Sequence, residues 1–401
     1  MTQAPQRTTV GIVGAGPAGL VLAHILRRER IPFVIVDRHA HAELRARSKA
    51  GLIEYRTVRL LAAEGIAGTI LHFATENHQC EFRTPNERIV IDYGALTGGR
   101  PQYVYPQHEL VGALADALLA SGSDIRFDVT VTGVRPSADS VTLIMTNAVG
   151  GTSEIHCEVV VGCDGPRGAI ASALDDVRVF EQTLPASWLA VIGEAPPLEA
   201  HTIYAAHPRG FAGQMRRGPS LTRYYLEVPA ADSVGDWPES RIRNELSERL
   251  GFAGRLDGVH LVEPSLVDLR VKVTEPMQRG RIFLAGDAAH LITPAGGKGM
   301  NLAIQDAVEV ARGLIDRFGA RQDERRLLRY SKTRLPDIWR AQAFSNWMLG
   351  LLLTSLGDGS SASSDDPGFG RGLRDGWVRS LQCDPLLARW FAYAYAGVDP
   401  G

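Results

Sequence analysis

Apolar residues near the start of the chain alternate between short β-branched runs and a stretch with helical spacing. The runs Thr8–Val13 and Pro32–Val36 are apolar, which is typical of strands buried in a parallel sheet. The segment from Pro17 to about Arg28 lies between them and is expected to form a helix. The pattern predicts a β-α-β arrangement that continues to about Gly68.

The pattern then changes to one in which strands outnumber helices. The stretch Cys80–Tyr105 is rich in strand candidates, and Gln107–Ala120 is expected to form a helix. The alternating segments Asp124–Val134 and Val141–Met145 predict strands of a small antiparallel layer.

Alternation returns between Ala186 and Pro229, where the segments SWLAVIGE, HTIYAAH and TRYYLEVP predict three strands. We interpret this part as a second, β-rich domain that forms the floor of a substrate pocket. After Asp287 the chain is predicted to be mainly helical. The expected helices are Leu302–Phe318, Arg325–Leu349 and Pro385–Ala396, and the polar segment Gly357–Asp366 is expected to be an exposed loop.

Length and charge limit the kind of protein. A chain of 401 residues is long enough for two closely packed domains. The net charge of −2 offers no basic surface for nucleic acid or for a membrane. The 4 cysteines have no metal-ligand spacing, and the N-terminal residues MTQAPQRTT lack the apolar stretch of a signal peptide. We therefore expect a cytoplasmic protein that binds no metal.

Three glycines follow the first predicted strand in the spacing of a dinucleotide-binding turn. Gly14 would make the tight turn, Gly16 would let a pyrophosphate approach the backbone, and Gly19 would let the next helix pack closely. Asp37, at the end of the second strand, is the acid expected to bind a ribose hydroxyl. A chance glycine-rich turn would lack this combination of strand, helix and acid, so we predict nucleotide binding.

Two later strands also end in polar residues. The buried strand Val159–Gly162 is followed by Asp164, and the strand Ile282–Ala285 is followed by Gly286 and Asp287. Ligands of open α/β sheets bind at these carboxyl ends, and Asp287 is expected to bind the ribityl chain of a flavin. Either dipeptide alone, Asp164-Gly165 or Gly286-Asp287, would indicate an ordinary turn.

A glycine-rich loop, Pro294–Asn301, precedes the predicted helix Leu302–Phe318. The amides at the start of this helix would face the flavin pyrimidine ring and stabilise the negative charge of the reduced form. The first glycine motif alone leaves NAD, NADP and FAD open. The three segments together indicate FAD.

The chain resembles the flavoprotein aromatic hydroxylases, which are single-component, FAD-dependent class A monooxygenases, and most closely those of the 4-hydroxybenzoate 3-monooxygenase type. The similarity runs from the first strand to the last few residues. The most distinctive stretches are Tyr204–Pro229, Glu275–His290 and Gly296–Ala307.

The resemblance and the pattern imply an α/β fold. A Rossmann-like, glutathione-reductase-type FAD-binding domain is interleaved with a β-rich substrate domain, and a helical C-terminal region follows. The expected FAD-binding parts are 1–75, 106–180 and 276–320, the substrate-domain parts are 76–105 and 181–275, and the helical region is 321–401.

The resemblance also implies a reaction, in which a flavin C4a-hydroperoxide transfers oxygen to the ring carbon ortho to a phenol hydroxyl. A phenolate is the better nucleophile, so the site must draw the proton away. Tyr204, Tyr395 and His78 match the residues that form this relay in the family. Pro294 matches the residue whose carbonyl group faces the substrate hydroxyl.

The family holds the substrate carboxylate with a serine, an arginine and a tyrosine. Arg217 and Tyr225 match the last two, but Met215 stands at the serine position. Gly213 stands where a larger apolar pocket residue is expected. Loss of a hydrogen bond to a charged group costs roughly 1.5–3 kcal/mol, so the substrate is either 4-hydroxybenzoate bound more weakly or a different aromatic compound.

Further cofactor contacts follow from the resemblance. The remaining flavin-binding residues are Arg38, Gln107, Arg223, Gly299, Met300 and Asn301. Candidates for the phosphates of the reductant are Arg38, Lys49, Arg167 and Arg270. Glu43 stands where the family has a tyrosine near the 2′-phosphate and would repel that group, so NADPH and NADH both stay open.

The expected function is hydroxylation of 4-hydroxybenzoate to 3,4-dihydroxybenzoate, with FAD as cofactor, NADPH or NADH as reductant and molecular oxygen as co-substrate. The expected partners are a small aromatic substrate and a second copy of the chain in a homodimer. A tailoring hydroxylase with another aromatic substrate, and a flavoprotein reductase without oxygen insertion, remain alternatives.

Overall fold

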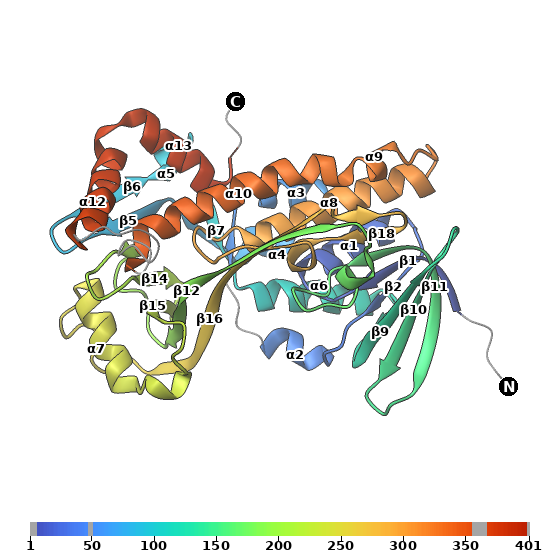
Figure 1. Cartoon of the computed structure of the whole chain (residues 1–401), viewed down its shortest axis with the longest axis horizontal. Helices are drawn as coiled ribbons and strands as arrows, with labels where there is room; N and C mark the ends of the chain where they lie inside the picture. The colour runs from blue at the N-terminus through green and yellow to red at the C-terminus, as the bar shows by residue number, and fades with distance from the viewer. Residues whose placement is uncertain (1–5, 47–50, 355–366, 399–401) are drawn as a thin grey trace.

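The structure is a computed structural model that describes residues 6–46, 51–354 and 367–398. Two large sheets lie side by side along the molecule, and the C-terminal helices run over them (Figure 1). Lys49 and the predicted loop Gly357–Asp366 lie outside the described residues.

The first sheet has eight strands and a parallel centre. Strand β1 (Gln6–Val13) lies between β2 (Phe33–Val36) and β11 (Thr152–Gly162), and β18 (Ile282–Leu284) runs beside β11. Helix α1 (Pro17–Arg28) joins β1 to β2, so the predicted β-α-β unit is confirmed. The buried parts of the central strands β1 and β11, Val10–Val13 and Val159–Gly162, consist of apolar residues and glycine, as expected for the centre of a parallel sheet.

The predicted antiparallel layer is present, but one of its strands is shorter than expected. Strands β9 (Val129–Pro136) and β10 (Val141–Asn147) pair with each other, and β10 continues the sheet from β11. The expectation of one strand over Asp124–Val134 is wrong, because β8 (Ile125–Arg126) pairs with β2 instead. Asp128 separates the two strands with a φ of 56°, a left-handed conformation that interrupts an extended chain.

The second sheet is also eight-stranded and contains the three strands predicted between Ala186 and Pro229. They are β12 (Arg178–Gly193), β13 (Thr202–Ala205) and β15 (Thr222–Pro229). The long strands β12 and β16 (Leu261–Glu275) extend from this sheet toward the first (Figure 1).

The sequence pattern did not predict β14 (Ala212–Arg216) or β16. Strand β14 is short and contains a glycine and a glutamine, and Pro264 interrupts the start of β16. The alternating stretch Leu269–Val273 is the signal that could have identified β16. Strands β5 (Gln79–Arg83) and β6 (Arg88–Asp92) come from much earlier in the chain, and β5 joins β13 in parallel.

Shorter elements fill the space between the sheets. A three-stranded sheet consists of β3 (Leu52–Ile53), β4 (Thr75–Asn77) and β7 (Gln102–Val104). The helices outside the C-terminal region are α2 (His41–Ala46), α3 (Tyr55–Ala63), α4 (Gly68–Phe73), α5 (Tyr93–Leu96), α6 (Gln107–Ala120) and α7 (Glu239–Leu250).

The predicted helix Arg325–Leu349 is divided into α9 (Arg325–Leu328) and α10 (Tyr330–Leu352). The side-chain amide of Gln278 lies at the break, where its nitrogen donates to the carbonyl oxygen of Leu327 at 2.7 Å. Its oxygen accepts from the amide of Ser331 at 3.0 Å. These are the two backbone groups that would bond to each other in a continuous helix, so Gln278 replaces that bond.

The other C-terminal helices are α8 (Gly299–Phe318), α12 (Pro367–Cys383) and α13 (Pro385–Ala396). Helix α12 was not predicted, and its glycines are unfavourable in a helix. In the part of the chain that the structure describes, no helix combines the length and the apolar character that crossing a membrane requires.

Candidate active site

The dinucleotide motif forms a turn whose backbone conformation requires glycine. Gly14 has a φ of 109°, and a Cβ atom there would lie 2.3 Å from the carbonyl oxygen of Cys163. A Cβ atom at Gly19 would lie 2.0 Å from the carbonyl oxygen of Gly14, so α1 packs tightly on the turn. Gly16, in contrast, has open space beside it, and no side chain caps the start of α1. The free amides of α1 can therefore receive a phosphate group.

Asp37 is buried at the end of β2, and its carboxylate organises the backbone around the turn. Its Oδ2 atom accepts from the amide of Ala15 at 2.6 Å, and its Oδ1 atom accepts from the amide of His39 at 2.8 Å. The ring nitrogen Nδ1 of His39 lies 2.9 Å from the same Oδ1 atom. Asp37 thus joins the glycine turn to the backbone of His39 at the carboxyl ends of β1 and β2.

Asp164 and Gly286 stand at the ends of the neighbouring strands β11 and β18. Asp164 Oδ2 accepts from the amide of Ile170 at 3.1 Å, while its Oδ1 atom is buried with no hydrogen-bond partner in the described residues. Burial raises the pKa of the Asp164 carboxyl. Gly286 has a φ of 61°, and a Cβ atom there would lie 2.9 Å from the Cβ atom of Ala303 on α8.

These strand ends open into one cleft with a volume of 310 Å³. Its lining includes seven of the predicted cofactor residues: Gly14, Gly16, Asp37, Arg38, Gln107, Asp164 and Asp287. Arg167, a candidate for the phosphates of the reductant, lines the cleft as well. The open turn, the uncapped helix start and the buried Asp164 oxygen fit the pyrophosphate and hydroxyl groups of a dinucleotide.

Three other predicted cofactor residues, Gly299, Met300 and Asn301, lie at the start of α8. Asn301 is buried, and its Oδ1 atom accepts from the amide of Glu54 at 2.9 Å. Its Nδ2 atom donates to the carbonyl oxygens of Leu52 and Gly297 at 3.1 and 2.8 Å. Asn301 therefore fixes the glycine-rich loop, and Gly299 and Met300 form the first helical residues beside it.

Asp306, which the sequence pattern did not indicate, supports the end of β18 from α8. Asp306 on α8 is fully buried, and its Oδ2 atom accepts from the amide of Gly286 at 3.0 Å and lies 2.6 Å from His290 Nε2. Its Oδ1 atom accepts from Arg334 Nε at 2.7 Å. Burial alone would raise the pKa of the Asp306 carboxyl, but His290 and Arg334 hold that pKa below its usual value.

A second, smaller pocket adjoins the cleft. Pro106 lines this pocket, and the next residue, Gln107, lines the cleft. The pocket has a volume of 40 Å³. Its lining includes six of the predicted catalytic, substrate and flavin residues: Tyr204, Met215, Arg217, Arg223, Tyr225 and Pro294. Gly297 of the glycine-rich loop lines it as well.

The alternation of the strands explains why these side chains meet. Tyr204 on β13, Gly213 on β14 and Tyr225 on β15 stand opposite one another across the sheet, and Met215 stands opposite Arg223. Residues two apart on a strand point to the same face, so the predicted positions share the face toward α13. The intervening residues pack on the opposite face, against α7.

Tyr204 lines the pocket, and its hydroxyl contacts that of Tyr395 on α13. The hydroxyl oxygens of Tyr204 and Tyr395 are 2.9 Å apart, and both side chains are fully buried. Burial raises the pKa of each phenol above its ordinary value. At neutral pH each group is therefore an uncharged hydroxyl that can both donate and accept a proton.

Two arginines bring positive charge to the same pocket. The side chains of Arg217 and Arg223 are 5% and 7% exposed. Burial, followed by the nearby charge of Arg223, lowers the pKa of the Arg217 guanidinium to about 10. A bound carboxylate would offset both effects, because it supplies an opposite charge inside the pocket.

Gly213 is not among the residues that line the pocket, and its role in substrate binding stays a prediction. A Cβ atom at Gly213 would lie 2.9 Å from the Cζ atom of Phe211. The Phe211 ring fills that space and packs against Trp188 and Tyr204, with ring centres 4.6 and 6.4 Å apart. The missing side chain is therefore replaced by an aromatic ring from the same strand region, and the pocket is not enlarged there.

His78 lies at the surface, where its Nε2 atom is 3.1 Å from Glu76 Oε2. Tyr93, which the sequence analysis did not single out, is packed between this region and the tyrosine pair. Its hydroxyl donates to the carbonyl oxygen of Asn77, and its ring centre is 5.0 Å from that of Tyr395. Whether protons leave the pocket through His78 stays a prediction.

Arg270 lies on β16 away from the cleft lining, with its Nε atom 3.3 Å from Glu181 Oε1. Its side chain is 34% exposed. Its role toward the reductant stays a prediction, as does that of Lys49, which is not among the described residues.

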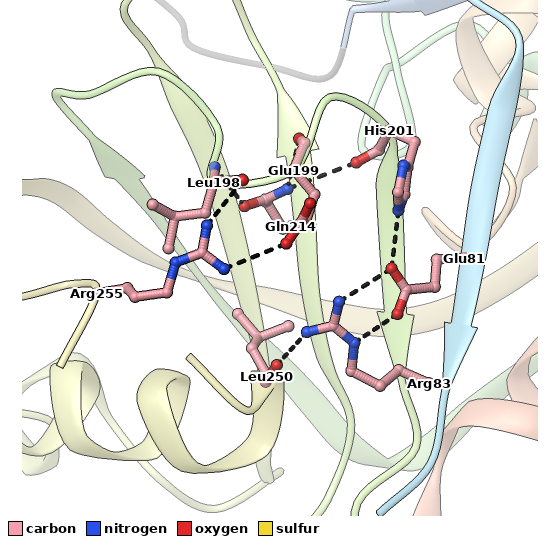
Figure 2. Close-up of polar contacts among 8 residues, drawn as sticks. All are labelled: Glu81, Arg83, Leu198, Glu199, His201, Gln214, Leu250 and Arg255. Carbon is pink, nitrogen blue, oxygen red and sulfur yellow. Dashed lines mark hydrogen bonds and ion pairs between the residues drawn. The ribbon is translucent and has the colours of Figure 1, made fainter. Parts of the chain in front are cut away.

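The opposite face of the substrate sheet carries an ion-pair network (Figure 2). Glu81 on β5 accepts two hydrogen bonds from Arg83, at 2.6 and 2.9 Å, and lies 2.8 Å from His201 Nε2. Arg83 also donates to the carbonyl oxygen of Leu250 at the end of α7. The network joins β5 to the start of β13 and thereby supports the strand that carries Tyr204.

Comparison with known proteins agrees with this geometry. The family model described as FAD binding domain matches residues 7–345. The p-hydroxybenzoate hydroxylase of Acinetobacter baylyi is 34% identical over 352 residues, which are 86% of each chain. A 12-dehydrotetracycline 5-monooxygenase/anhydrotetracycline 6-monooxygenase of Streptomyces rimosus is 30% identical over 76% of this chain, but this chain spans only 62% of it.

Among solved structures, p-nitrophenol 4-monooxygenase PnpA from Pseudomonas putida has the same fold, with a TM-score of 0.83 at 19% identity and coverage of 99% and 100% of the two chains. The match over most of the chain, together with the cleft and the pocket, confirms the expected fold class and the expected cofactors: FAD, a nicotinamide reductant and molecular oxygen. The chain belongs to the FAD-binding-domain family and is an FAD-dependent aromatic monooxygenase.

Proposed function

We propose that this enzyme hydroxylates a phenolic carboxylic acid at the carbon ortho to its hydroxyl group, and that its substrate is 4-hydroxybenzoate. The observation that carries the proposal is that Tyr204, whose hydroxyl lies 2.9 Å from that of Tyr395, lines the same pocket as the buried Arg217. The pocket thus offers a hydroxyl pair for a phenol and a positive charge for a carboxylate.

The hydroxyl pair provides a route for the substrate proton. Tyr204 would accept the phenol proton as it passes its own proton to Tyr395, and Tyr395 would release its own proton in turn toward His78 and solvent, so that both tyrosines end as neutral hydroxyls and the substrate remains as the phenolate. A phenolate formed in this way is activated at its ortho carbon. Since both tyrosines are shielded from solvent, the proton leaves without water entering the pocket.

FAD, held by the cleft residues, supplies the reaction with oxygen when it is bound. The residues that would hold it are the glycine turn, Asp37, Asp164 and Asp287, with Pro294 and Gly297 at the junction to the pocket. The role of the chain's own residues is to orient the aromatic ring, exclude water and move the proton.

Met215 supports a second candidate, a hydroxylase of a different phenolic compound. Its thioether faces the pocket beside Arg217 and cannot replace a hydroxyl donor. The relative from Streptomyces rimosus is named for tetracycline-type substrates, so larger phenols are tested beside single-ring acids.

A substrate panel distinguishes the candidates. Purified enzyme is mixed with single-ring phenolic acids, neutral phenols and larger phenols, and NAD(P)H oxidation, oxygen consumption and product mass are measured together. Stoichiometric hydroxylation of 4-hydroxybenzoate is expected. Reductant consumption without oxygen insertion for every compound would favour a reductase, and hydroxylation of neutral phenols alone would favour the second candidate.

The same preparation tests three further predictions. NADH and NADPH are compared as reductants, and the homodimer is tested by light scattering after gel filtration. The division into an FAD-binding domain, a β-rich substrate domain and a helical region also stays a prediction, which limited proteolysis can test at the expected boundaries.

A further inference from the structure

Thr202 on β13 is a polar residue of the substrate pocket to which the proposed reaction gives no role. It lines the pocket together with Tyr204, which follows it by two residues on the same strand. Residues two apart on a strand point to the same face, and Ile203 between them packs on the opposite face, against α7. The side chain of Thr202 therefore faces the substrate pocket.

The Thr202 hydroxyl accepts one hydrogen bond and donates none to the described residues. Asn77 Nδ2 donates to Thr202 Oγ1 at 3.2 Å, and an amide nitrogen cannot accept a proton in return. Asn77 is itself held in this orientation, because its Oδ1 atom accepts from the amide of Gln79 at 3.4 Å. The proton of the Thr202 hydroxyl is thus left to point away from Asn77.

The surroundings of Thr202 make this unused donor informative. Its side chain is buried, with 4% of the residue exposed, so water has little access to the hydroxyl. A buried donor without an acceptor destabilises a fold, and such groups usually have a partner in the working molecule. Since Thr202 lines the pocket, the partner we expect is an acceptor atom of the bound substrate.

The strand register shows which part of the substrate Thr202 would face. Ile203 pairs with Gln214 on β14, so the next step along these antiparallel strands brings Thr202 beside Met215. Side chains at such neighbouring positions have Cβ atoms about 4.5–5.5 Å apart and can contact the same group of a ligand. Met215 also lines the pocket, and its thioether has no proton to donate.

The order of residues on β14 leads from the tyrosine to the arginine of the pocket. Tyr204 stands opposite Gly213, Met215 comes two residues after Gly213, and Arg217 comes two residues after Met215. The row that contains Thr202 and Met215 therefore lies on the Arg217 side of Tyr204. This is the side at which the proposed function places the substrate carboxylate.

We propose that Thr202 determines specificity by donating a hydrogen bond to the substrate carboxylate, and so supplies the hydroxyl that position 215 lacks. The proposal rests on the proposed function and adds a residue to it. Arg217 and Tyr225 line the same pocket, so the carboxylate would meet a positive charge and two hydroxyl groups. A phenol without a carboxylate would gain nothing from Thr202.

The test compares Thr202→Val with Thr202→Ser in FAD-loaded enzyme, using the change in flavin absorbance on titration. Valine keeps the shape and removes the hydroxyl, so the affinity for 4-hydroxybenzoate should fall about tenfold or more. Serine keeps the donor and should retain most of the affinity. The affinity for 4-methylphenol, which has no carboxylate, should be the same in both variants and in the wild type.

Kinetics separates binding from the proton route. Thr202→Val should raise the KM for 4-hydroxybenzoate, while the ratio of product to NAD(P)H consumed at saturating substrate stays at the wild-type value. This is expected because the hydroxyl pair of Tyr204 and Tyr395 is intact in the variant.

A double-mutant cycle tests whether Thr202 replaces the hydroxyl missing at position 215. Met215→Ser should restore most of the affinity for 4-hydroxybenzoate in the Thr202→Val background. In the wild type the same substitution should have a smaller effect, because one hydroxyl donor is already present. Equal effects of Met215→Ser in the two backgrounds would contradict the replacement.

Thr222→Val is the matched control. Thr222 is a fully buried threonine of the same sheet, and its Oγ1 atom donates to the carbonyl oxygen of Ala195 at 2.8 Å. It is not among the residues that line the pocket. Loss of this hydroxyl should leave the affinity for 4-hydroxybenzoate unchanged.

Three results would overturn the proposal: equal affinity of Thr202→Val and wild type for 4-hydroxybenzoate, an equal loss for 4-methylphenol, or a Thr202→Ser variant as weak as Thr202→Val. If the wild type still binds and hydroxylates 4-hydroxybenzoate in these cases, only the role of Thr202 fails. If the wild type binds no aromatic carboxylate, the proposed function fails together with it.

Discussion

The hydroxyl oxygens of Tyr204 and Tyr395 lie 2.9 Å apart although 191 residues separate them in the chain. Tyr204 comes from the middle of a sheet and Tyr395 from the last described helix. The two rings meet nearly at right angles, 84°, and Phe391 stacks on Tyr395 with ring centres 5.1 Å apart. Ring packing therefore holds the two tyrosines in place, so the hydroxyl contact can be removed by a Tyr→Phe substitution that keeps the shape of the ring.

Tyr204→Phe is expected to leave FAD binding intact and to uncouple the reaction. The substrate would still bind, but its proton would lose the first acceptor of the route, so reductant and oxygen would be consumed with little product. The measurement is the ratio of hydroxylated product to NAD(P)H consumed. Tyr224→Phe is the control, because Tyr224 is equally buried on the opposite face of the sheet. An unchanged ratio in Tyr204→Phe would remove the tyrosine pair from the mechanism.

Arg217 and Met215 are expected to have opposite effects on substrate affinity. Arg217→Gln removes the buried positive charge, and the affinity for 4-hydroxybenzoate should fall at least about tenfold. Met215→Ser restores a hydroxyl donor beside it, and affinity should rise by up to about tenfold. Binding is followed by the change in flavin absorbance on titration. If neither substitution alters the affinity for any aromatic acid, the substrate is not held through a carboxylate.

Gly213 and Phe211 are expected to be energetically coupled. Gly213→Leu would place its side chain on the Phe211 ring and destabilise the fold by about 1–3 kcal/mol. Phe211→Ala should cost less in the Gly213→Leu chain than in the wild type, because the leucine fills part of the space that the ring leaves. Urea unfolding of the two single variants and the double variant gives the coupling energy. Additive changes would show that the ring does not occupy the space left by the glycine.

Glu81 is expected to make stability depend on pH in the acid range. Burial alone would raise the pKa of the Glu81 carboxyl, but hydrogen bonds from His201 and Arg83 lower that pKa from 4.5 to about 2. A carboxyl group with a lowered pKa stabilises the folded state above its ordinary pKa, and the contribution is lost as the pH falls through 4.5 toward 2.

The wild type should therefore lose about 2 kcal/mol more unfolding free energy than Glu81→Gln between about pH 7 and about pH 3. Urea unfolding at a series of pH values measures this difference. Glu154→Gln is the control, because its ion pair with Arg135 lies at the surface. Parallel pH profiles for wild type and Glu81→Gln would contradict the role of the network in Figure 2.

Asp306→Asn is expected to weaken FAD binding as well as stability. The substitution removes the buried partner of Arg334 and leaves only Asp337, which lies 3.0 Å away, so the fold should lose a few kcal/mol, up to about 3–5 kcal/mol. It also weakens the support of the Gly286 amide at the cofactor cleft. FAD release is measured by flavin fluorescence at a temperature where the variant stays folded. Equal FAD affinity in the folded variant would restrict Asp306 to a purely structural role.

Local sequence patterns were sufficient for the parallel sheet and its nucleotide turn. The apolar runs of β1 and β2 and the close approach of Gly19 to Gly14 depend on residues near one another in the chain, so they are readable from it. The contact of Gly14 with Cys163 depends on the pairing of β1 with β11 and is not. The break at Arg329 could not be read in this way, because it depends on Gln278, which is distant in sequence. The left-handed conformation of Asp128, which separates β8 from β9, has no signal in the apolar pattern either.

For the site, the sequence by itself determined which residue types are present: tyrosines, arginines and glycines at positions that match a known family. Only the tertiary structure decided which of them meet. In the folded chain Tyr395 contacts Tyr204, the Phe211 ring occupies the space beside Gly213, and Asp306 accepts a hydrogen bond from the amide of Gly286 at the end of β18. These relationships join residues from different elements, and their distances depend on how sheets and helices pack, which no local pattern of hydrophobic and polar positions encodes.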